Sequence, residues 1–386
     1  MTTRIYLDNA ATTPVRAQAL EAMLPYFSEH GYNASSVHAE GRAARAALDD
    51  ARTRVARCIG AKSKEIVFTG GGSEADNLAL IGVARALRDR GRHLVSTAIE
   101  HHAVLHALDA LRDESFEVTL LAVDADGSVG VDEFSAALRP DTILASVMYV
   151  NNEIGTVQPV AQLAAAARAN GTLFHTDAVQ AAAYLPIDVG ALGVDLLSLS
   201  AHKFNGPKGT GVLYAREGTP ILPLIYGGSQ EFAKRAGTEN VAGIMGLTVA
   251  LELALDERSE NSGRVGALRD RFEAQVAARI SGVRVNGREV LRAPHISNLS
   301  FVGVTSEQLL MRLDLDGIAV SAGSACASGA VEPSHVIAAL GLPDAWMRGV
   351  VRFSLGRSTT QGEIDRTVEV LERAVADLRS ISEIPV

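Results

Sequence analysis

Short runs rich in β-branched residues alternate with longer Ala-, Leu- and Arg-rich helical patterns over the first two-thirds of the chain. This alternation is typical of a parallel sheet covered by helices, because each parallel crossover needs a connection about as long as a helix. We expect seven strands, at 65–69, 93–98, 117–123, 142–150, 172–176, 195–200 and 211–215. Only AHKFNGPKGT separates the last two, which is too short for a crossover, so this pair is predicted to be antiparallel.

The pattern changes after about residue 261 to a mixture of helices and strands. We expect helices at 264–279, 306–313, 334–339 and from 362 onwards, with strands near 283 and at 298–301 and 350–354. The predicted class is therefore α/β, with a large domain at 15–260 on a seven-stranded, mostly parallel sheet and a smaller α+β C-terminal domain at 261–386. The N-terminal segment 1–14 is expected to join the two, and 386 residues suffice for both cores.

The charge pattern and the cysteines exclude several function classes. The formal net charge is −9, and the 36 Lys and Arg residues are scattered, so direct binding to nucleic acid is not expected. The start MTTRIYLDNAATTP lacks signal-peptide features and no apolar run reaches membrane-spanning length, so we expect a cytoplasmic protein without a membrane anchor. Cys58 and Cys326 form no C-x-x-C pair, which argues against a disulfide framework or a cysteine-based zinc site.

A glycine-rich turn in FTGGGSEADNLALIG joins a predicted strand to a helix that we expect to begin at Ser73. Backbone amides at such a turn and at a helix N-terminus bind anions, so a phosphate site is one interpretation. In the other, Ser73 only caps the helix and Asp76 completes a capping box. The turn alone does not decide between them, because Glu74 and Asp76 bring negative charge to the same place.

Polar residues follow the neighbouring strands, at the sheet edge where open α/β sheets bind ligands. They are Glu100, His101, His102, Asn151, Asn152, Glu153, Asp177, Gln180, Ser200, His202 and Lys203. Lys203, between a Ser-x-His triplet and a tight Gly/Pro turn, suits a Schiff-base lysine better than an ordinary surface lysine. Pyridoxal phosphate needs such a lysine, a phosphate cradle and a carboxylate at its ring nitrogen, for which Asp177 is the candidate.

The adjacent His101 and His102 allow three interpretations. A solvated loop pair is one and zinc ligation is another, although no third metal ligand stands at a defined spacing. We favour an aromatic platform, because a flat imidazole stacks on a pyridine ring and carries a proton near neutral pH.

The segment SAGSACASGAVEPS carries Cys326 at its centre, and eleven of its fourteen residues are Ser, Ala, Gly or Pro. This composition predicts a loop with few side chains to anchor it. A thiol on such a loop is open to oxidation, which favours a nucleophile or sulfur carrier. Cys58, in the helical context ARTRVARCIG, fits a buried structural cysteine instead.

The run VVRFSLGRS places Arg352 on a predicted strand of the small domain and Arg357 just beyond it. A planar guanidinium fork matches a carboxylate through two parallel hydrogen bonds. Arg352 is therefore the candidate for binding an amino-acid substrate, whereas we interpret Arg357 as a surface or structural residue.

Nine motifs stand in order along nearly the whole chain: YLDNAATTP, FTGGGSEADN, EHHAVL, VNNEIGTVQP, HTDAVQ, SLSAHKFNGPKGTG, RAGTENV, SAGSACAS and VRFSLGR. In these motifs the sequence resembles the NifS/IscS-type cysteine desulfurases of the class V aminotransferase group. The resemblance implies an aspartate-aminotransferase-like fold of type I, pyridoxal phosphate as cofactor, and conversion of L-cysteine to L-alanine. The sulfur would pass to Cys326 as an enzyme-bound persulfide, for iron–sulfur cluster assembly and other thiolation pathways.

The resemblance also implies roles for individual residues. The cofactor-binding residues would be Gly72, Ser73, His101, Asn152, Asp177, Gln180, Ser200, His202, Lys203 and, from the second subunit of a homodimer, Thr238. Lys203 and His101 would act in catalysis, with the lysine joined to the cofactor and the imidazole stacked on its ring. Asn152 and Arg352 would bind the substrate. Cys326 would accept sulfur and make a transient iron–sulfur contact through its persulfide.

The sequence departs from the family pattern at three places. Relatives often have S-G-A-T at 70–73, S-G-H at 200–202 and a serine at Ala322, and none of these changes removes a reacting group. The implied partners are L-cysteine and an iron–sulfur scaffold protein or other sulfur acceptor. Two alternatives stay open: another enzyme on this scaffold, such as an aminotransferase, epimerase or selenocysteine lyase, and a non-catalytic sulfur-assembly scaffold.

Overall fold

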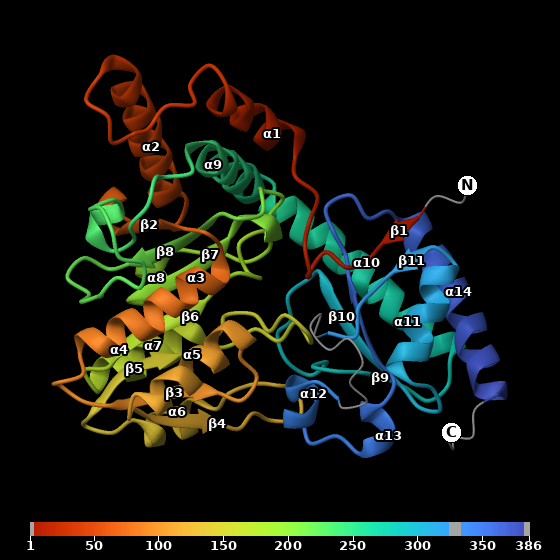
Figure 1. The fold of residues 1–386 in the computed structure, drawn as a ribbon. Helices are drawn as coiled ribbons and strands as arrows, with labels where there is room; N and C mark the ends of the chain where they lie inside the picture. Colours follow the sequence, from red (N-terminus) through yellow and green to blue (C-terminus); the bar gives the residue numbers. More distant parts are fainter. Residues whose placement is uncertain (1–3, 324–332, 382–386) are drawn as a thin grey trace.

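The computed structural model describes residues 4–323 and 333–381. Its largest element is a seven-stranded sheet with strand order β2-β8-β7-β6-β5-β3-β4 (Figure 1). The strands are β2 (Ile66–Thr69), β3 (His93–Thr97), β4 (Glu117–Leu121), β5 (Thr142–Ser146), β6 (Leu173–Asp177), β7 (Leu196–Ser200) and β8 (Gly211–Ala215). All neighbours are parallel except β8, which runs antiparallel to both β2 and β7. The predicted class, the seven strands and the antiparallel last pair are confirmed.

The prediction that the fourth strand extends to residue 150 was wrong. The β5 ladder ends at Ser146, and Val150 forms an isolated antiparallel bridge with Val157 instead. The chain therefore leaves the sheet between these positions. This early departure carries the backbone of Asn152 and Glu153 to the pocket described below.

Helices cover both faces of the large sheet, and each face has its own hydrophobic core. The flanking helices are α1 (Ala17–Met23), α2 (Ala39–Cys58), α3 (Gly72–Asn77), α4 (Val83–Ala86), α5 (His102–Asp113), α6 (Val131–Ala137), α7 (Val160–Ala169), α8 (Val189–Leu192) and α9 (Val241–Asp256). On β7, Leu196 packs with the core beneath α3, α4 and α5, while Leu197 packs with the core beneath α2, α7 and α9. This alternation follows from the two-residue period of a strand.

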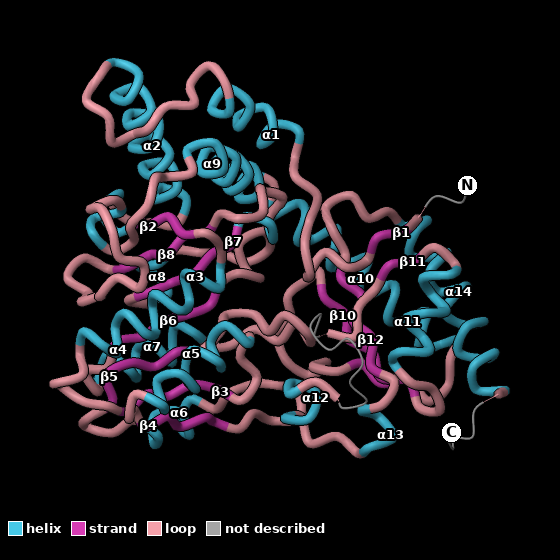
Figure 2. The backbone as a smooth tube through the Cα atoms, in the orientation of Figure 1, coloured by secondary structure: helices cyan, strands magenta, loops and turns pink. Residues whose placement is uncertain are grey.

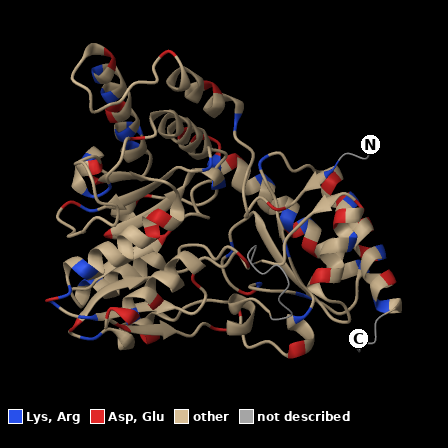
Figure 3. Ribbon diagram, in the orientation of Figure 1, with Lys and Arg blue, Asp and Glu red and all other residues tan. Residues whose placement is uncertain are grey.

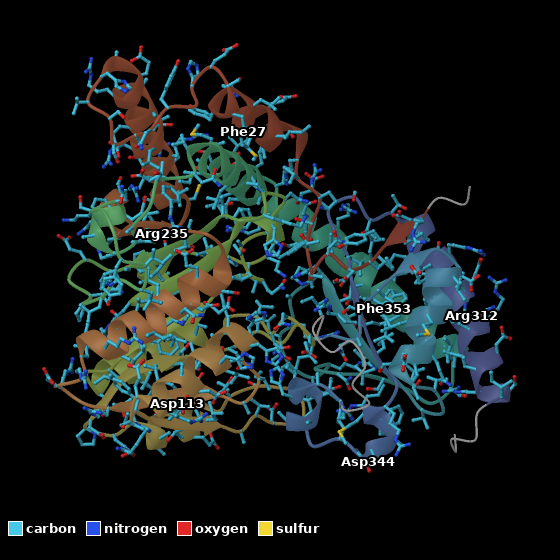
Figure 4. All side chains as sticks on the ribbon, viewed as in Figure 1. Phe27, Asp113, Arg235, Arg312, Asp344 and Phe353 are labelled. Carbon is cyan, nitrogen blue, oxygen red and sulfur yellow. The ribbon has the colours of Figure 1, made fainter. Side chains whose placement is uncertain are left out.

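A second, smaller unit follows, in which helices pack on a three-stranded antiparallel sheet of order β12-β10-β9. Strands β10 and β12 are labelled in Figure 2 and β9 in Figure 1. Its elements are α10 (Arg258–Arg279), β9 (Val283–Val285), β10 (Ile296–Phe301), α11 (Ser306–Leu315), β11 (Ile318–Ala319), α12 (His335–Ala339), α13 (Asp344–Met347), β12 (Val350–Ser354) and α14 (Gln361–Ser380). Phe272 and Phe353 meet in its core with ring centroids 4.8 Å apart; Phe353 is labelled in Figure 4. The α+β character predicted for this part of the chain is present.

The N-terminal segment belongs to both units. Strand β1 (Ile5–Tyr6) pairs in parallel with β11 of the smaller unit, and the chain then runs past the end of β7. The domain boundary at 260/261 stays a prediction, and it falls in the first turn of α10.

Charged residues of both signs are interspersed along the elements of both units (Figure 3). In the ranges that the structure describes, no helix combines the length and apolar character needed to cross a bilayer.

Candidate active site

A pocket of about 290 Å³ lies where the ends of β6 and β7 meet the N-terminal segment and the smaller unit. Ten of the residues predicted from the sequence line it: Gly72, Ser73, His101, Asn152, Asp177, Gln180, Ser200, His202, Lys203 and Arg352. Most of them follow parallel strands, and the carboxyl ends of parallel strands share one edge of the sheet, which brings these residues together.

Lys203 ends a single 3₁₀ turn that begins directly after β7. Its Nζ donates hydrogen bonds to the carbonyl oxygens of Ala10 (2.5 Å) and Ala11 (2.9 Å). Burial, assisted by the Arg352 guanidinium, lowers the pKa of Lys203 to about 8. A substantial fraction of this amine is therefore neutral near pH 8, as a nucleophile or base requires. Sequence reasoning missed Ala10 and Ala11, because a backbone acceptor leaves no mark on residue type.

Asp177 is the last residue of β6 and is buried at the floor of the pocket. Its Oδ1 accepts a hydrogen bond from the amide of Val179 (2.8 Å). Burial raises the pKa of Asp177, while His101 and Lys203 oppose that rise. This carboxyl is consequently one that a cationic ring nitrogen would hold in its ionised form.

His101 is the N-cap of α5, and its Nδ1 accepts a hydrogen bond from the amide of Ala103 (3.1 Å). That bond leaves the proton of the neutral ring on Nε2. Burial lowers the pKa of His101, with Lys203 and His102 acting in the same direction. The imidazole is thus neutral at physiological pH in the absence of a bound anion, and its ring borders the pocket.

The capping-box interpretation of the glycine-rich turn was wrong. Helix α3 begins at Gly72, its N-cap is Gly71, and no side chain caps it, so the first amides keep their hydrogen-bonding capacity. Glu74 turns away from the pocket, because it accepts from the Gly70 amide (2.8 Å) and pairs with Arg235 (2.9 Å). Asp76 points inward and is only 1% exposed.

Gly72 sits where the backbone approaches its neighbours closely. A Cβ at this position would lie 2.9 Å from Val179 Cγ2 and 3.3 Å from Ser200 Cβ. Together with the hydroxyls of Ser73 and Ser200 and the imidazole of His202, whose pKa burial lowers to about 4, the turn forms a narrow cradle of neutral hydrogen-bonding groups. Such a cradle matches a phosphate group.

Arg352 reaches the pocket from β12 and is only 2% exposed. Its Nη1 donates to the carbonyl oxygens of Asn152 (2.8 Å) and Gly323 (3.1 Å), and its Nη2 pairs with Asp8 (2.8 Å). Its buried Nε has no partner within the described part of the chain. The guanidinium is therefore fixed in position with donor capacity left over, and its partner Asp8 lies in a motif to which sequence reasoning gave no role.

Two of the predicted or considered residues, Thr238 and Cys58, lie away from the pocket, and the placement of a third is not described. Thr238 is exposed and does not line this pocket, and Cys326 lies outside the described residues. Cys58 packs at the edge of the large core, where burial raises its pKa to about 11, in agreement with a structural role. Within residues 4–323 and 333–381, no cluster of three or more His, Cys, Asp or Glu is arranged to hold a metal ion.

Residues 5–367 match the family described as Aminotransferase class-V. The chain belongs to this family. It is 50% identical to "Cysteine desulfurase IscS" of Dictyoglomus turgidum over 99% of this chain and 97% of that protein. It is 48% identical to "Cysteine desulfurase IscS" of Methanosarcina thermophila over 98% of this chain and 93% of that protein.

Solved structures agree with the class-V assignment. A NifS-like protein superposes with a TM-score of 0.92 at 35% identity, covering 97% of this chain and 100% of that one. SspA in complex with cysteine superposes with a TM-score of 0.82 at 36% identity, covering 93% of this chain and 100% of that one. The fold is accordingly that of the type I pyridoxal-phosphate enzymes.

Class-V aminotransferases use pyridoxal phosphate, and the pocket fits this cofactor. It offers a partly buried lysine with a lowered pKa, a buried carboxyl at the end of β6, and an uncapped helix N-terminus beside a glycine that leaves no room for a side chain. These are the amine, the ring-nitrogen partner and the phosphate cradle that the cofactor requires.

Proposed function

We propose that this chain is a pyridoxal-phosphate-dependent cysteine desulfurase that converts L-cysteine to L-alanine and transfers the sulfur to Cys326 as a persulfide. The observation that carries the proposal is the convergence of the Lys203 amine and the Arg352 guanidinium on one pocket, in a chain nearly half identical to proteins named cysteine desulfurase. The likeness to a structure described as a complex with cysteine supports the substrate.

Arg352 binds the substrate carboxylate, because its fork is already oriented by Asp8 and by two carbonyl oxygens. The bound cofactor supplies an electron-withdrawing ring that stabilises negative charge at the substrate α-carbon. The Lys203 amine, with its pKa of about 8, takes the α-proton and returns it. Asp177 would hold a proton at the ring nitrogen, and His101, with its own proton on Nε2, would stack on the ring.

Sulfur transfer requires a second nucleophile. The Cys326 thiolate attacks the substrate sulfur, an S–S bond forms as the Cβ–S bond breaks, and the electron pair stays with Cβ. Protonation of Cβ then completes alanine, which leaves the persulfide on Cys326. This persulfide supplies sulfur for iron–sulfur cluster assembly and is the group through which Cys326 would contact iron.

The proposed partners follow from the same assignment. A homodimer would bring Thr238 of each subunit to the phosphate of the other, which agrees with its exposed position in this chain. An iron–sulfur scaffold protein or another sulfur acceptor would receive the persulfide sulfur, and the cytoplasm is the proposed location.

Persulfide trapping tests the proposal. The protein is incubated with L-cysteine, alkylated and digested, and the modified thiol is located by mass spectrometry. We expect one extra sulfur on Cys326, alanine as product, and loss of both in Cys326→Ala, which should still bind the yellow cofactor. Cys58→Ala is the matched control and should behave as the parent protein. Keto-acid formation, or undiminished desulfuration by Cys326→Ala, would point to another enzyme of the family.

A further inference from the structure

A second carboxyl lies in the pocket beside Asp177. Asp76 is on α3, one turn after Gly72, and is 1% exposed. It lines the same pocket as Asp177, and its Oδ1 has no hydrogen-bond partner within the described part of the chain. The nearest ring nitrogen, His175 Nε2, is 3.7 Å from this oxygen, which is too far for a hydrogen bond. A buried and unpartnered carboxylate is strongly unfavourable, so this group needs an explanation.

His175 does not supply the missing positive charge. It precedes Asp177 by two residues on β6 and is fully buried. Its Nδ1 and Nε2 lie 2.9 and 3.0 Å from the hydroxyls of Ser146 and Ser198. Burial lowers the pKa of His175 to about 3, so the ring is neutral. Two neutral hydroxyls satisfy it without a proton from Asp76.

The remaining charges around Asp76 also disfavour a second anion. Burial raises the pKa of Asp76 most, the other buried carboxyls Asp177 and Glu100 raise it further, and the hydroxyl of Ser198 acts in the opposite direction. Of the pocket cations, Arg352 is paired with Asp8, and Lys203 donates to two carbonyl oxygens of the N-terminal segment. Asp177, in contrast, has a backbone donor and is favoured as an anion by His101 and Lys203.

We propose that Asp76 and Asp177 form a carboxyl pair in which Asp76 holds a proton as a neutral acid, leaving Asp177 as the member of the pair that faces the cofactor ring nitrogen as an anion. Two close carboxyls do not both ionise, and the proton goes to the one with weaker stabilisation of its charge. Asp76 is thus a positioning residue that acts through Asp177. This inference rests on the proposed function only in taking Asp177 as the ring-nitrogen partner.

Infrared difference spectroscopy tests the pair directly. The carbonyl stretch of a protonated carboxylic acid is separate from that of a carboxylate, and it is measured at neutral pH on the cofactor-loaded protein and on the same protein after cofactor removal. We expect Asp76→Asn to lose one protonated-acid band in both forms. Glu100→Gln is the matched control, because it removes a different buried acid and should leave the Asp76 band in place. An unchanged spectrum in Asp76→Asn overturns the proposal.

Cofactor spectroscopy provides a readout that a purely structural role would not move. Asn keeps the shape and neutrality of a protonated Asp, so Asp76→Asn should bind the cofactor with unchanged affinity and an unchanged visible spectrum at neutral pH. At alkaline pH the parent protein should show an absorbance transition from ionisation of Asp76, and Asp76→Asn should lack it. A spectrum in the variant that is already altered at neutral pH would mean that Asp76 is an anion there. Failure of the protein to bind pyridoxal phosphate at all would instead overturn the proposed function.

Discussion

The two walls of the pocket hold their functional groups in different ways. The sheet wall consists of Asp177, Ser200 and Lys203, which lie at the ends of two neighbouring strands and are surrounded by the large core. The β12 wall consists of Arg352, which depends on Asp8, Asn152 and Gly323 from three distant segments. The sheet wall is fixed by strand pairing, whereas the β12 wall exists only when the N-terminal segment and both units are assembled.

This difference also separates two ways of burying charge. The sheet wall buries the Asp177 carboxyl and the Lys203 amine without a direct ion pair to either, and burial shifts both pKa values. The β12 wall buries an ion pair whose members compensate each other. Groups of the first kind are suited to exchanging protons, and groups of the second kind to binding a substrate in a fixed position.

The largest expected effect comes from removing the amine of the sheet wall. Lys203→Ala should lower kcat for alanine formation by roughly 10³-fold, because the base and the covalent attachment point are lost together. Lys208→Ala, at an exposed lysine in the following loop, should keep full activity. Comparable losses of kcat in both variants would mean that the activity depends on the conformation of this loop rather than on the Lys203 amine.

Glu100, which precedes His101 and lies outside the sheet wall, is another buried carboxyl with a shifted pKa, and it makes such burial measurable as a pH dependence of stability. Burial raises its pKa to about 8, from an ordinary value of 4.5. The folded protein then holds a proton that the unfolded chain releases, so stability is greatest below the unfolded pKa and falls as pH rises towards the folded pKa. The loss should be on the order of 4 kcal/mol.

Urea unfolding of the cofactor-free protein between these two pKa values checks this expectation. Glu100→Gln should flatten the pH dependence, whereas Glu133→Gln, at an exposed glutamate of α6, should leave it intact. A slope that survives in Glu100→Gln would assign the effect to another group.

Replacing the planar guanidinium group of Arg352 by the compact ammonium group of a lysine tests the ion pair with Asp8 in the β12 wall. Arg352→Lys keeps the charge but cannot satisfy Asp8, the two carbonyl oxygens and a substrate carboxylate together. We expect kcat/KM for L-cysteine to fall by roughly 100-fold, or about 2.7 kcal/mol, mainly through KM. Arg357→Lys, at a partly exposed position, should change it little. An effect on kcat alone would argue against carboxylate binding by Arg352.

The smallest effect is expected on cofactor affinity when a side chain is added at Gly72, where the backbone lies close to Val179 and Ser200 beside the sheet wall. In Gly72→Ala the new Cβ would press on Val179 and Ser200 and displace the helix N-terminus. Cofactor affinity should weaken about tenfold, by about 1.4 kcal/mol, in a fluorescence or absorbance titration. Gly263→Ala on α10, where a Cβ meets nothing within 4 Å, is the control and should bind normally.

The contrast between the walls also decides what could be predicted from the sequence. Strand-end logic found Asp177, Gln180 and Lys203, because strand pairing alone brings such residues together. The same logic could not find the contact between Asp8 and Arg352, since no local pattern connects positions 344 residues apart. For Asp76 the sequence left a capping role open, because its spacing from Ser73 fits a capping box, and only the tertiary packing turns it inward.

The pairing of β1 with β11 has a consequence for how the protein is made. Ile5 leaves the ribosome long before its partner Ile318 is synthesised. Strand β1 therefore stays unpaired until most of the chain has been made. The carbonyls of Ala10 and Ala11 that hold Lys203 lie just beyond this strand and are secured equally late. The large sheet can therefore form during translation, but the reactive amine reaches its final surroundings only when the last third of the protein has folded.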